Sequence, residues 1–222
     1  MNRFQSTPAL RTAFAASILL AAMFGSAHAS RPLSVDDANV SDAGKGYGEF
    51  WGARGTGRTN SFTLAPAYAP IDGIEIGVSL SRDMSASVVS KALQLKWRIT
   101  KSAANGCNFG AVFGASHQQS VGNTPYVNGL FTCNGGFGAL HVNLGASRAP
   151  GGPTLKSAGL AYERELGPVT AHVEWFGQQQ GRPTVQMGLR RSLGAGNEWQ
   201  IDGTLGRSNG DTVFSLGLKY SL

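Results

Sequence analysis

The chain has 222 residues, a net charge of +6, only 14% charged residues and 31 glycines. Ordinary soluble domains carry about 25% charged residues and about 7% glycine, so this composition argues against a helical protein. Its longest strongly apolar run lies at the N-terminus, and a transmembrane helix needs about 20 apolar residues, which excludes a bundle of such helices. Any membrane role must therefore use another architecture.

Residues 1–29 have the three-part pattern of a secretory signal peptide. Arg3 and Arg11 precede the apolar run AFAASILLAAMF, which is followed by the small-residue sequence AHA. The alternative, a membrane anchor helix, is disfavoured because the apolar run is short. We expect cleavage before Ser30. Export and the modest positive charge argue against a nucleic-acid partner.

Cys107 and Cys133 are the only cysteines. An exported chain meets an oxidising compartment, so a disulfide between them is predicted. The sequence contains neither a CxxC nor an HExxH motif, and neither a metal nor another cofactor is predicted.

From Gly46 onward, runs of about ten residues alternate apolar with polar or small side chains, and turn-forming residues separate the runs. The clearest run is the last, where Phe214 to Leu222 alternate without a break. The pattern predicts an all-β fold, an antiparallel up-and-down transmembrane β-barrel over residues 46–222. We expect twelve strands, at 45–54, 60–69, 74–82, 87–99, 106–118, 125–134, 136–147, 156–164, 169–178, 184–193, 198–207 and 212–222.

An even number of strands returns both ends of the predicted barrel chain to one side of the membrane. Short connections at 70–73, 134–136 and 165–168 are predicted periplasmic turns. Longer or Gly- and Pro-rich connections at 55–59, 119–124, 149–155 and 179–183 fit outward-facing loops. Residues 30–45 are predicted to form a polar periplasmic N-terminal segment, for which a flexible tail is favoured over a plug in the lumen.

A soluble β-sandwich or lipocalin-like barrel is the main alternative, because its alternation differs only in the direction of the apolar face. Long polar side chains on one face of several strands favour the membrane barrel, since a soluble barrel would have to bury them. Aromatic residues near strand ends are expected to form girdles at the membrane interfaces. The candidates are Tyr68, Trp97, Tyr126, Tyr162, Trp175, Trp199 and Tyr220.

The two cysteines also predict a register. A hairpin centred near Ser120 places residues opposite each other when their numbers sum to about 240, as those of Cys107 and Cys133 do. A cross-strand disulfide near the periplasmic end follows, with a structural role.

Charged residues of both signs fall on the predicted inward face. They are compatible with a narrow charged water path or with a lumen closed by ion pairs. The predicted lumen-lining residues are Glu75, Lys96, Arg98, Glu163, His172, Glu174, Arg190, Asp202 and Lys219.

Two other functions are alternatives to a channel. His172 and Glu174 share a strand face, as a catalytic base and its partner would, but no GxSxG or comparable nucleophile signature accompanies them, so no enzyme is predicted. A structural or adhesive barrel with a closed lumen is the other alternative. Its outer loops would contact outer-membrane lipid and lipopolysaccharide through basic side chains that pair with phosphates, the candidates being Arg54, Arg58, Arg148, Arg182 and Arg207.

Four stretches of the chain carry a family resemblance: RPLSVDDA at 31–38, APAYAPIDGIEIGVSLSRD at 65–83, LQLKWRI at 93–99 and LGPVTAHVEWFG at 166–177. Together they are similar to an outer-membrane β-barrel family named after the meta pathway of phenol degradation. The resemblance implies a Gram-negative outer-membrane transporter or channel that the barrel assembly machinery inserts. It also implies uptake of small molecules, aromatic or hydrophobic ones among them.

Overall fold

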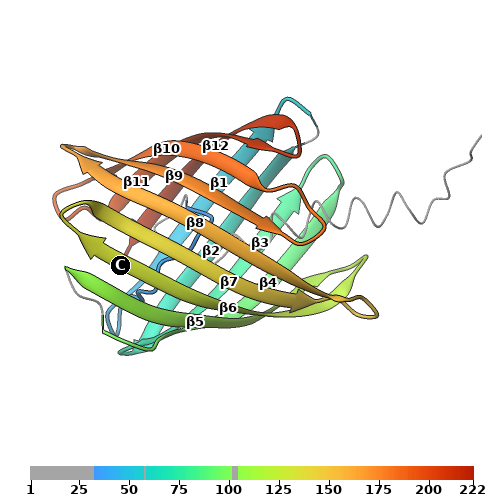
Figure 1. Ribbon diagram of the computed structural model, residues 1–222, viewed down its shortest axis with the longest axis horizontal. Helices are drawn as coiled ribbons and strands as arrows, with labels where there is room; N and C mark the ends of the chain where they lie inside the picture. Colours follow the sequence, from blue (N-terminus) through green and yellow to red (C-terminus); the bar gives the residue numbers. More distant parts are fainter. Residues whose placement is uncertain (1–32, 58, 102–104) are drawn as a thin grey trace, which may run out of the picture.

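The computed structural model describes residues 33–57, 59–101 and 105–222, and it is a closed barrel of twelve antiparallel strands (Figure 1). The predicted signal peptide and Arg58 lie outside the described residues. No helix within the described ranges is long and apolar enough to cross a membrane.

Each strand pairs with its neighbours in the sequence, and β1 pairs with β12 to close the barrel, with Trp51 opposite Gly217. Closure leaves no edge strand with unpaired backbone groups, as a strand-built membrane protein requires. The strands are β1 (Gly46–Gly55), β2 (Asn60–Ile71), β3 (Ile74–Asp83), β4 (Val88–Arg98), β5 (Gly106–Gln118), β6 (Gly122–Gly135), β7 (Gly138–Arg148), β8 (Thr154–Leu166), β9 (Val169–Gln178), β10 (Thr184–Leu193), β11 (Trp199–Ser208) and β12 (Asp211–Ser221).

The predicted fold class is confirmed, and the predicted strand limits differ most at β6. This strand begins at Gly122 rather than at residue 125. The sequence GNT reads as part of a turn, because Gly and Asn are common turn residues. In the barrel these residues continue the β5–β6 ladder, where Asn123 lies opposite His117.

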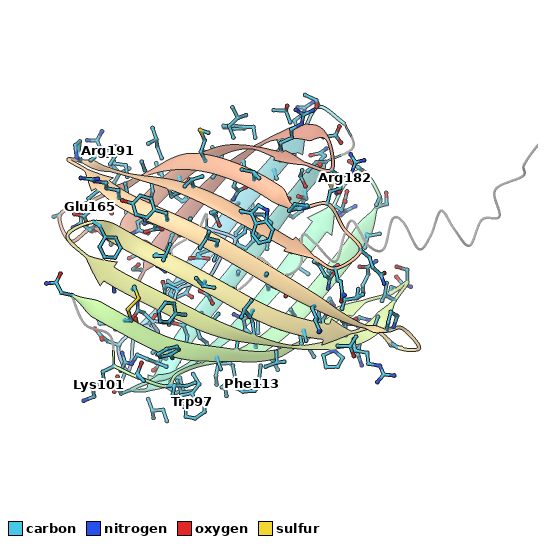
Figure 2. The ribbon with its side chains drawn as sticks, in the orientation of Figure 1. Trp97, Lys101, Phe113, Glu165, Arg182 and Arg191 are labelled. Carbon is cyan, nitrogen blue, oxygen red and sulfur yellow. A yellow bond between two sulfur atoms is a disulfide. The ribbon has the colours of Figure 1, made fainter. Side chains whose placement is uncertain are left out.

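The apolar face of every strand points outward. Side chains such as Leu144, Met187 and Leu93 are 66%, 64% and 58% exposed, and Figure 2 shows Trp97 and Phe113 projecting away from the barrel wall. An apolar surface that continues around the whole barrel is far larger than soluble monomers expose. The outward direction of this face favours the membrane barrel over the soluble alternative.

The two ends of the barrel differ in the side chains that they present. We call the end where β1 begins and β12 finishes the terminal end (left in Figure 1) and the opposite end the loop end. Outward aromatic residues gather at the terminal end, namely Tyr68, Trp97, Tyr162, Trp199 and Tyr220. Exposed cations gather at the loop end, namely Arg54, Arg82, Lys91, Arg148, Lys156, Arg182 and Arg207.

One member of the predicted aromatic girdle is misplaced. Tyr126 points into the barrel, where its hydroxyl donates a hydrogen bond of 2.9 Å to Gln94. Its even-numbered neighbours in β6, Thr124 and Leu130, are buried in the lumen as well. β6 alternates poorly, so its sequence does not show that Tyr126 belongs to the inward face.

The terminal end does not carry only short connections, nor the loop end only long ones. The β11–β12 connection at the loop end is the two-residue turn Asn209–Gly210, whose φ angles of 52° and 94° are typical of a type I′ hairpin. The long β4–β5 connection lies at the terminal end. The loop-end cations and terminal-end aromatics therefore distinguish the ends better than loop length does.

The predicted disulfide is present. Cys107 and Cys133 lie directly opposite each other in the β5–β6 ladder, with their Cα atoms 4.0 Å apart. The bond lies at the terminal end. Phe109 and Phe131 form the next matching cross-strand pair, with ring centroids 4.9 Å apart.

Candidate functional site: an occupied lumen

Residues 33–45, here called the N-terminal segment, lie inside the barrel rather than extending from it. Leu33, Val35, Asp36 and Ala38 are at most 1% exposed. The polar composition of residues 30–45 favours a flexible tail, and the structure differs from that expectation. The reason is that the lumen wall offers specific partners to the apolar, acidic and backbone groups of the segment.

Apolar side chains of the segment meet apolar side chains that point inward from the wall. These apolar residues occupy inward positions that are polar in the other strands, which explains why β5 and β6 alternate poorly. Leu33 and Val35 pack with Ala161 and Phe176, and Ala38 packs with Val112 and Leu130.

Two wall glycines lie where the segment comes closest. A Cβ atom on Gly159 would lie 2.8 Å from Cγ2 of Val35, and one on Gly110 would lie 3.1 Å from the carbonyl oxygen of Ala38. Both distances are shorter than an ordinary contact between side chains. Glycine at these positions therefore allows the segment to lie against the barrel wall.

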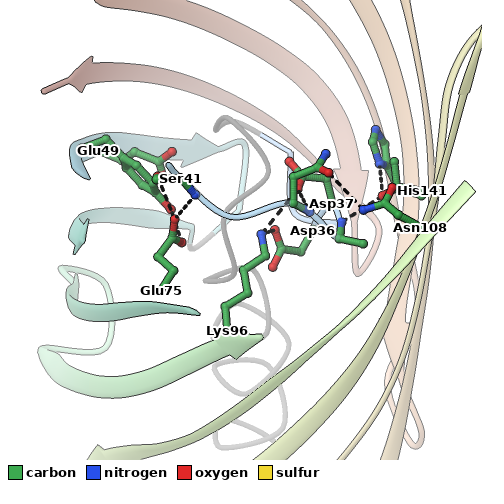
Figure 3. Close-up of polar contacts among 12 residues, drawn as sticks. Asp36, Asp37, Ser41, Glu49, Glu75, Lys96, Asn108 and His141 are labelled. Carbon is green, nitrogen blue, oxygen red and sulfur yellow. Dashed lines mark hydrogen bonds and ion pairs between the residues drawn. The ribbon is translucent and has the colours of Figure 1, made fainter. Parts of the chain in front are cut away.

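A buried ion pair joins the segment to β4 (Figure 3). Nζ of Lys96 lies 2.9 Å from Oδ1 of Asp36 and 3.5 Å from Oδ1 of Asp37. Complete burial raises the pKa of the Asp36 carboxyl well above its usual range, and the ammonium of Lys96 opposes that rise. Withdrawal of the segment would leave Lys96 in the lumen without these carboxylates.

Two wall carboxylates accept hydrogen bonds from the segment's backbone. Glu174 accepts from the N–H groups of Ser34 and Val35, the latter at 2.8 Å. Glu75 accepts from the N–H of Ser41 at 3.0 Å and from its hydroxyl at 2.8 Å. Hydrogen bonds to charged groups are stronger than those between neutral groups, so both contacts favour the docked segment.

Amide and hydroxyl side chains complete the attachment. Oγ1 of Thr132 accepts from the N–H of Ala38 at 2.9 Å, and Nδ2 of Asn108 donates to Oδ1 of Asn39 at 3.0 Å. With its amide oriented to match these partners, Asn143 bonds both the N–H and the carbonyl of Asp36, at 2.7 and 2.8 Å. Nearly every residue from Ser34 to Ser41 thus has a partner on the wall.

The remaining predicted lumen residues form ion pairs with one another or with nearby groups. Their pairs are Arg190 with Glu163 at 2.7 Å, Lys219 with Glu49 at 3.4 Å, Arg98 with Asp72, and His172 with Asp202 at 2.9 Å. All the predicted lumen-lining residues lie on the inward face, and Lys96, Glu75 and Glu174 also contact the segment.

His172 lies between two carboxylates of the lumen wall. Nε2 of His172 lies 2.9 Å from Asp202, and Nδ1 lies 3.9 Å from Glu174, so carboxylates flank both ring nitrogens. A nucleophilic mechanism needs a hydroxyl or thiol within hydrogen-bond reach of the base. The groups that flank the ring of His172 are the carboxylates of Asp202 and Glu174.

Charge is unevenly distributed along the lumen. The charged residues described above line the terminal-end half and the middle, beside the segment. Towards the loop end the wall carries hydroxyl and amide side chains, many of them hydrogen-bonded across strands, including Thr63, Ser81, Ser90, Ser116, Gln118, Thr124, Ser147, Gln178, Thr184, Thr204, Ser208 and Ser215.

A small cavity lies where the segment meets this uncharged wall. Its volume is about 30 Å³, and Ser34, Asn128, Asn143, Ser157 and Gln178 contribute polar groups to it. This space suits about one water molecule, since water needs roughly 10–15 Å³ for its centre and two to four polar partners.

Sequence reasoning identified the wall but missed the segment's part in the site. Asp36, Asp37 and Ser41 were not candidate site residues, because the segment has no strand-like alternation. The available signal was indirect, because a lysine on the inward face needs an acidic partner. Opposite Lys96 lie Val112 on β5 and Glu75 on β3, and Glu75 also bonds Ser41 and Tyr47.

Comparisons with known proteins support the architecture. The sequence matches no model of a known protein family and no curated protein. Among solved structures it is similar to the KdgM porin, with a TM-score of 0.59 and 12% identity over 79% of this chain and 99% of that chain. The KdgM porin in complex with disordered oligogalacturonate matches with a TM-score of 0.64, at the same identity and coverage. At this identity the likeness shows the fold alone, which is that of a porin-like β-barrel.

Proposed function

We propose that this protein is an outer-membrane channel for small water-soluble molecules, and that the N-terminal segment closes it in the conformation described here. The observation that carries the proposal is the nature of the barrel interior. It is a polar lumen occupied by a separate stretch of chain, rather than a core filled by wall side chains alone. Such a segment leaves a water path when it withdraws.

The wall towards the loop end supports uncharged hydrophilic solutes as the favoured class. Its hydroxyl and amide groups offer hydrogen bonds in both directions, and its charged side chains are the acids Asp83 and Asp211 at the rim. Oligogalacturonate, which the KdgM porin binds, and the aromatic compounds implied by the family resemblance are the competing solutes. An acidic sugar would meet few cations on this part of the wall.

Solute uptake into liposomes tests this proposal. One set of liposomes would contain the intact protein, and a second set would contain a protein that lacks residues 33–42. Uptake of a neutral disaccharide, of oligogalacturonate and of benzoate would be measured with each set. We expect the shortened protein to admit the neutral sugar at least about tenfold faster than the intact protein, and faster than either anion.

Two outcomes would revise the proposal. Preferential entry of benzoate would favour the aromatic substrates that the resemblance implies. If neither protein admits any solute although both migrate as folded barrels on unheated gels, the closed structural barrel would replace the channel.

A further inference from the structure

We propose that the outer wall of the barrel carries a binding site for a phosphorylated, acylated lipid of the outer leaflet, such as lipopolysaccharide. The site combines an apolar groove across β7, β8 and β9 with basic side chains at the border of the groove nearest the loop end. It lies on the lipid-facing surface and does not depend on whether the lumen conducts.

The groove comes from a row of small side chains between larger ones. Its volume is about 690 Å³. Ala146, Ala158 and Gly177 form its floor, and Leu144 and Trp175 stand beside them, 66% and 43% exposed. Strand register makes the floor continuous, because Ala158 lies opposite Gly177. An apolar hollow on a membrane-facing wall is filled by a lipid chain, since water is absent there.

The border of the groove nearest the loop end is cationic. Lys156 lines the groove and lies opposite Ala146. Arg148 lies opposite Thr154, so it is the diagonal neighbour of Lys156 on the same outward face. Arg182 is flanked by Gly181 and Pro183, which line the groove. A chain lying in the groove would therefore place its headgroup among three basic side chains.

These cations have no acidic partners of their own. None of the three forms an ion pair within residues 33–57, 59–101 and 105–222, whereas the lumen cations Lys96, Arg190 and Lys219 all do. The loop-end acids Asp83 and Asp211 lie on β3 and β12, away from the groove strands, and both are half-buried on the inward-facing side. Asp83 accepts hydrogen bonds from the N–H groups of Ser85 and Ala86.

The terminal end shows that this pattern is not a general property of the surface. Its exposed cations Lys101, Arg164 and Arg191 share that end with exposed acids, of which Glu165 adjoins Arg164 in the sequence and Asp72 pairs with Arg98. Figure 2 shows Glu165 and Arg191 at that end and Arg182 at the opposite one. Unpaired cations above an apolar groove match a lipid that has both acyl chains and phosphates, because Arg and Lys form charge-assisted bonds to phosphate.

Native mass spectrometry of the purified barrel in detergent tests the site, with diphosphoryl lipid A as the probe. The variant R148Q/K156Q/R182Q removes the charges. The matched control K101Q/R164Q/R191Q removes as many exposed cations at the terminal end. We expect lipid A to bind the first variant at least about tenfold more weakly than the unchanged protein, because basic side chains near the membrane surface attract anionic headgroups, and to bind the control within twofold of it.

A second variant and two other ligands separate the groove from the charges. A158F fills the groove without changing any charge, and we expect it to weaken binding at least about threefold. Phosphatidylethanolamine should bind more weakly than lipid A, and millimolar inorganic phosphate should not displace lipid A. Equal affinities of the loop-end variant and its terminal-end control would overturn the proposal, as would displacement by free phosphate or undiminished binding of dephosphorylated lipid A.

Discussion

Lys96 is the side chain on which docking of the N-terminal segment most depends. It is 1% exposed, and its ion pair with Asp36 is equally buried. Burial of charges is costly, and the loss of one partner is costlier than the loss of both, because an uncompensated charge then remains in the interior. The pair thus favours one position of the segment over all others.

Asp36→Asn removes one charge of this pair while keeping the shape of the side chain. We expect the docked segment to lose about 3 kcal/mol relative to the released one. Hydrogen exchange at the backbone N–H groups of Val35 and Ala38, both bonded to the wall, should become correspondingly faster.

The double variant Asp36→Leu/Lys96→Met is the matched control, since apolar replacement of both charges of a buried pair is often neutral. Its exchange should stay close to that of the unchanged protein. If the single variant exchanged no faster than the double one, the ion pair would have no part in docking.

Gly159 tests the close approach of the segment without changing charge. Gly159→Val places a side chain where Val35 now lies, because even a Cβ would come within 2.8 Å of it. We expect the overpacking to cost the docked segment about 1–3 kcal/mol, seen as faster proteolysis near Val35.

Gly203→Val is its control, because a Cβ on Gly203 meets nothing closer than 4.0 Å. The control should leave proteolysis unchanged. Equal cleavage of both variants would mean that the new side chain is accommodated without moving the segment.

Among the elements, the β5–β6 hairpin has the clearest covalent constraint. The disulfide closes a sequence separation of 26 residues. Chain-entropy arguments then give about 3.5 kcal/mol of stabilisation. We expect Cys107→Ser/Cys133→Ser to lower the free energy of unfolding in urea by about this amount.

The bond faces outward at the terminal end, away from the N-terminal segment, so solute uptake by the double serine variant should not change. A changed uptake rate at unchanged strand content would show that this hairpin also takes part in closure.

The predictability of each element followed its surroundings. β12 alternates without a break, because lipid on one side and polar lumen on the other impose period two, and its position was predicted closely. β5 and β6 alternate poorly because Val112 and Leu130 face inward to meet Ala38. The segment itself could not be placed from sequence, since its partners come from strands far along the chain, such as Glu174 and Lys96.

At the scale of the whole molecule, the two ends define a direction across the membrane. Aromatic residues ring the terminal end, and exposed cations ring the loop end. We propose that the loop end faces the cell exterior, because phosphate-rich lipid headgroups are the natural partners of unpaired cations.

Cysteine labelling in intact cells tests this orientation. We expect Asn209→Cys, in the loop-end turn, to react with a membrane-impermeant maleimide in intact cells. Gly167→Cys, in the terminal-end β8–β9 turn, should react only after the outer membrane is permeabilised. The reverse pattern would invert the proposed orientation.

The most direct test of the account is to lock the N-terminal segment in place and then release it. Val35→Cys/Gly159→Cys introduces two thiols where the segment touches the wall, and the Val35→Cys protein, which keeps Gly159, is the control for the reductant, which also reaches the Cys107–Cys133 bond. In planar bilayers we predict no conductance steps from the oxidised double variant, and intermittent steps after reduction, whenever the freed segment leaves the lumen. Equal conductance of the oxidised and reduced forms would contradict closure by the segment.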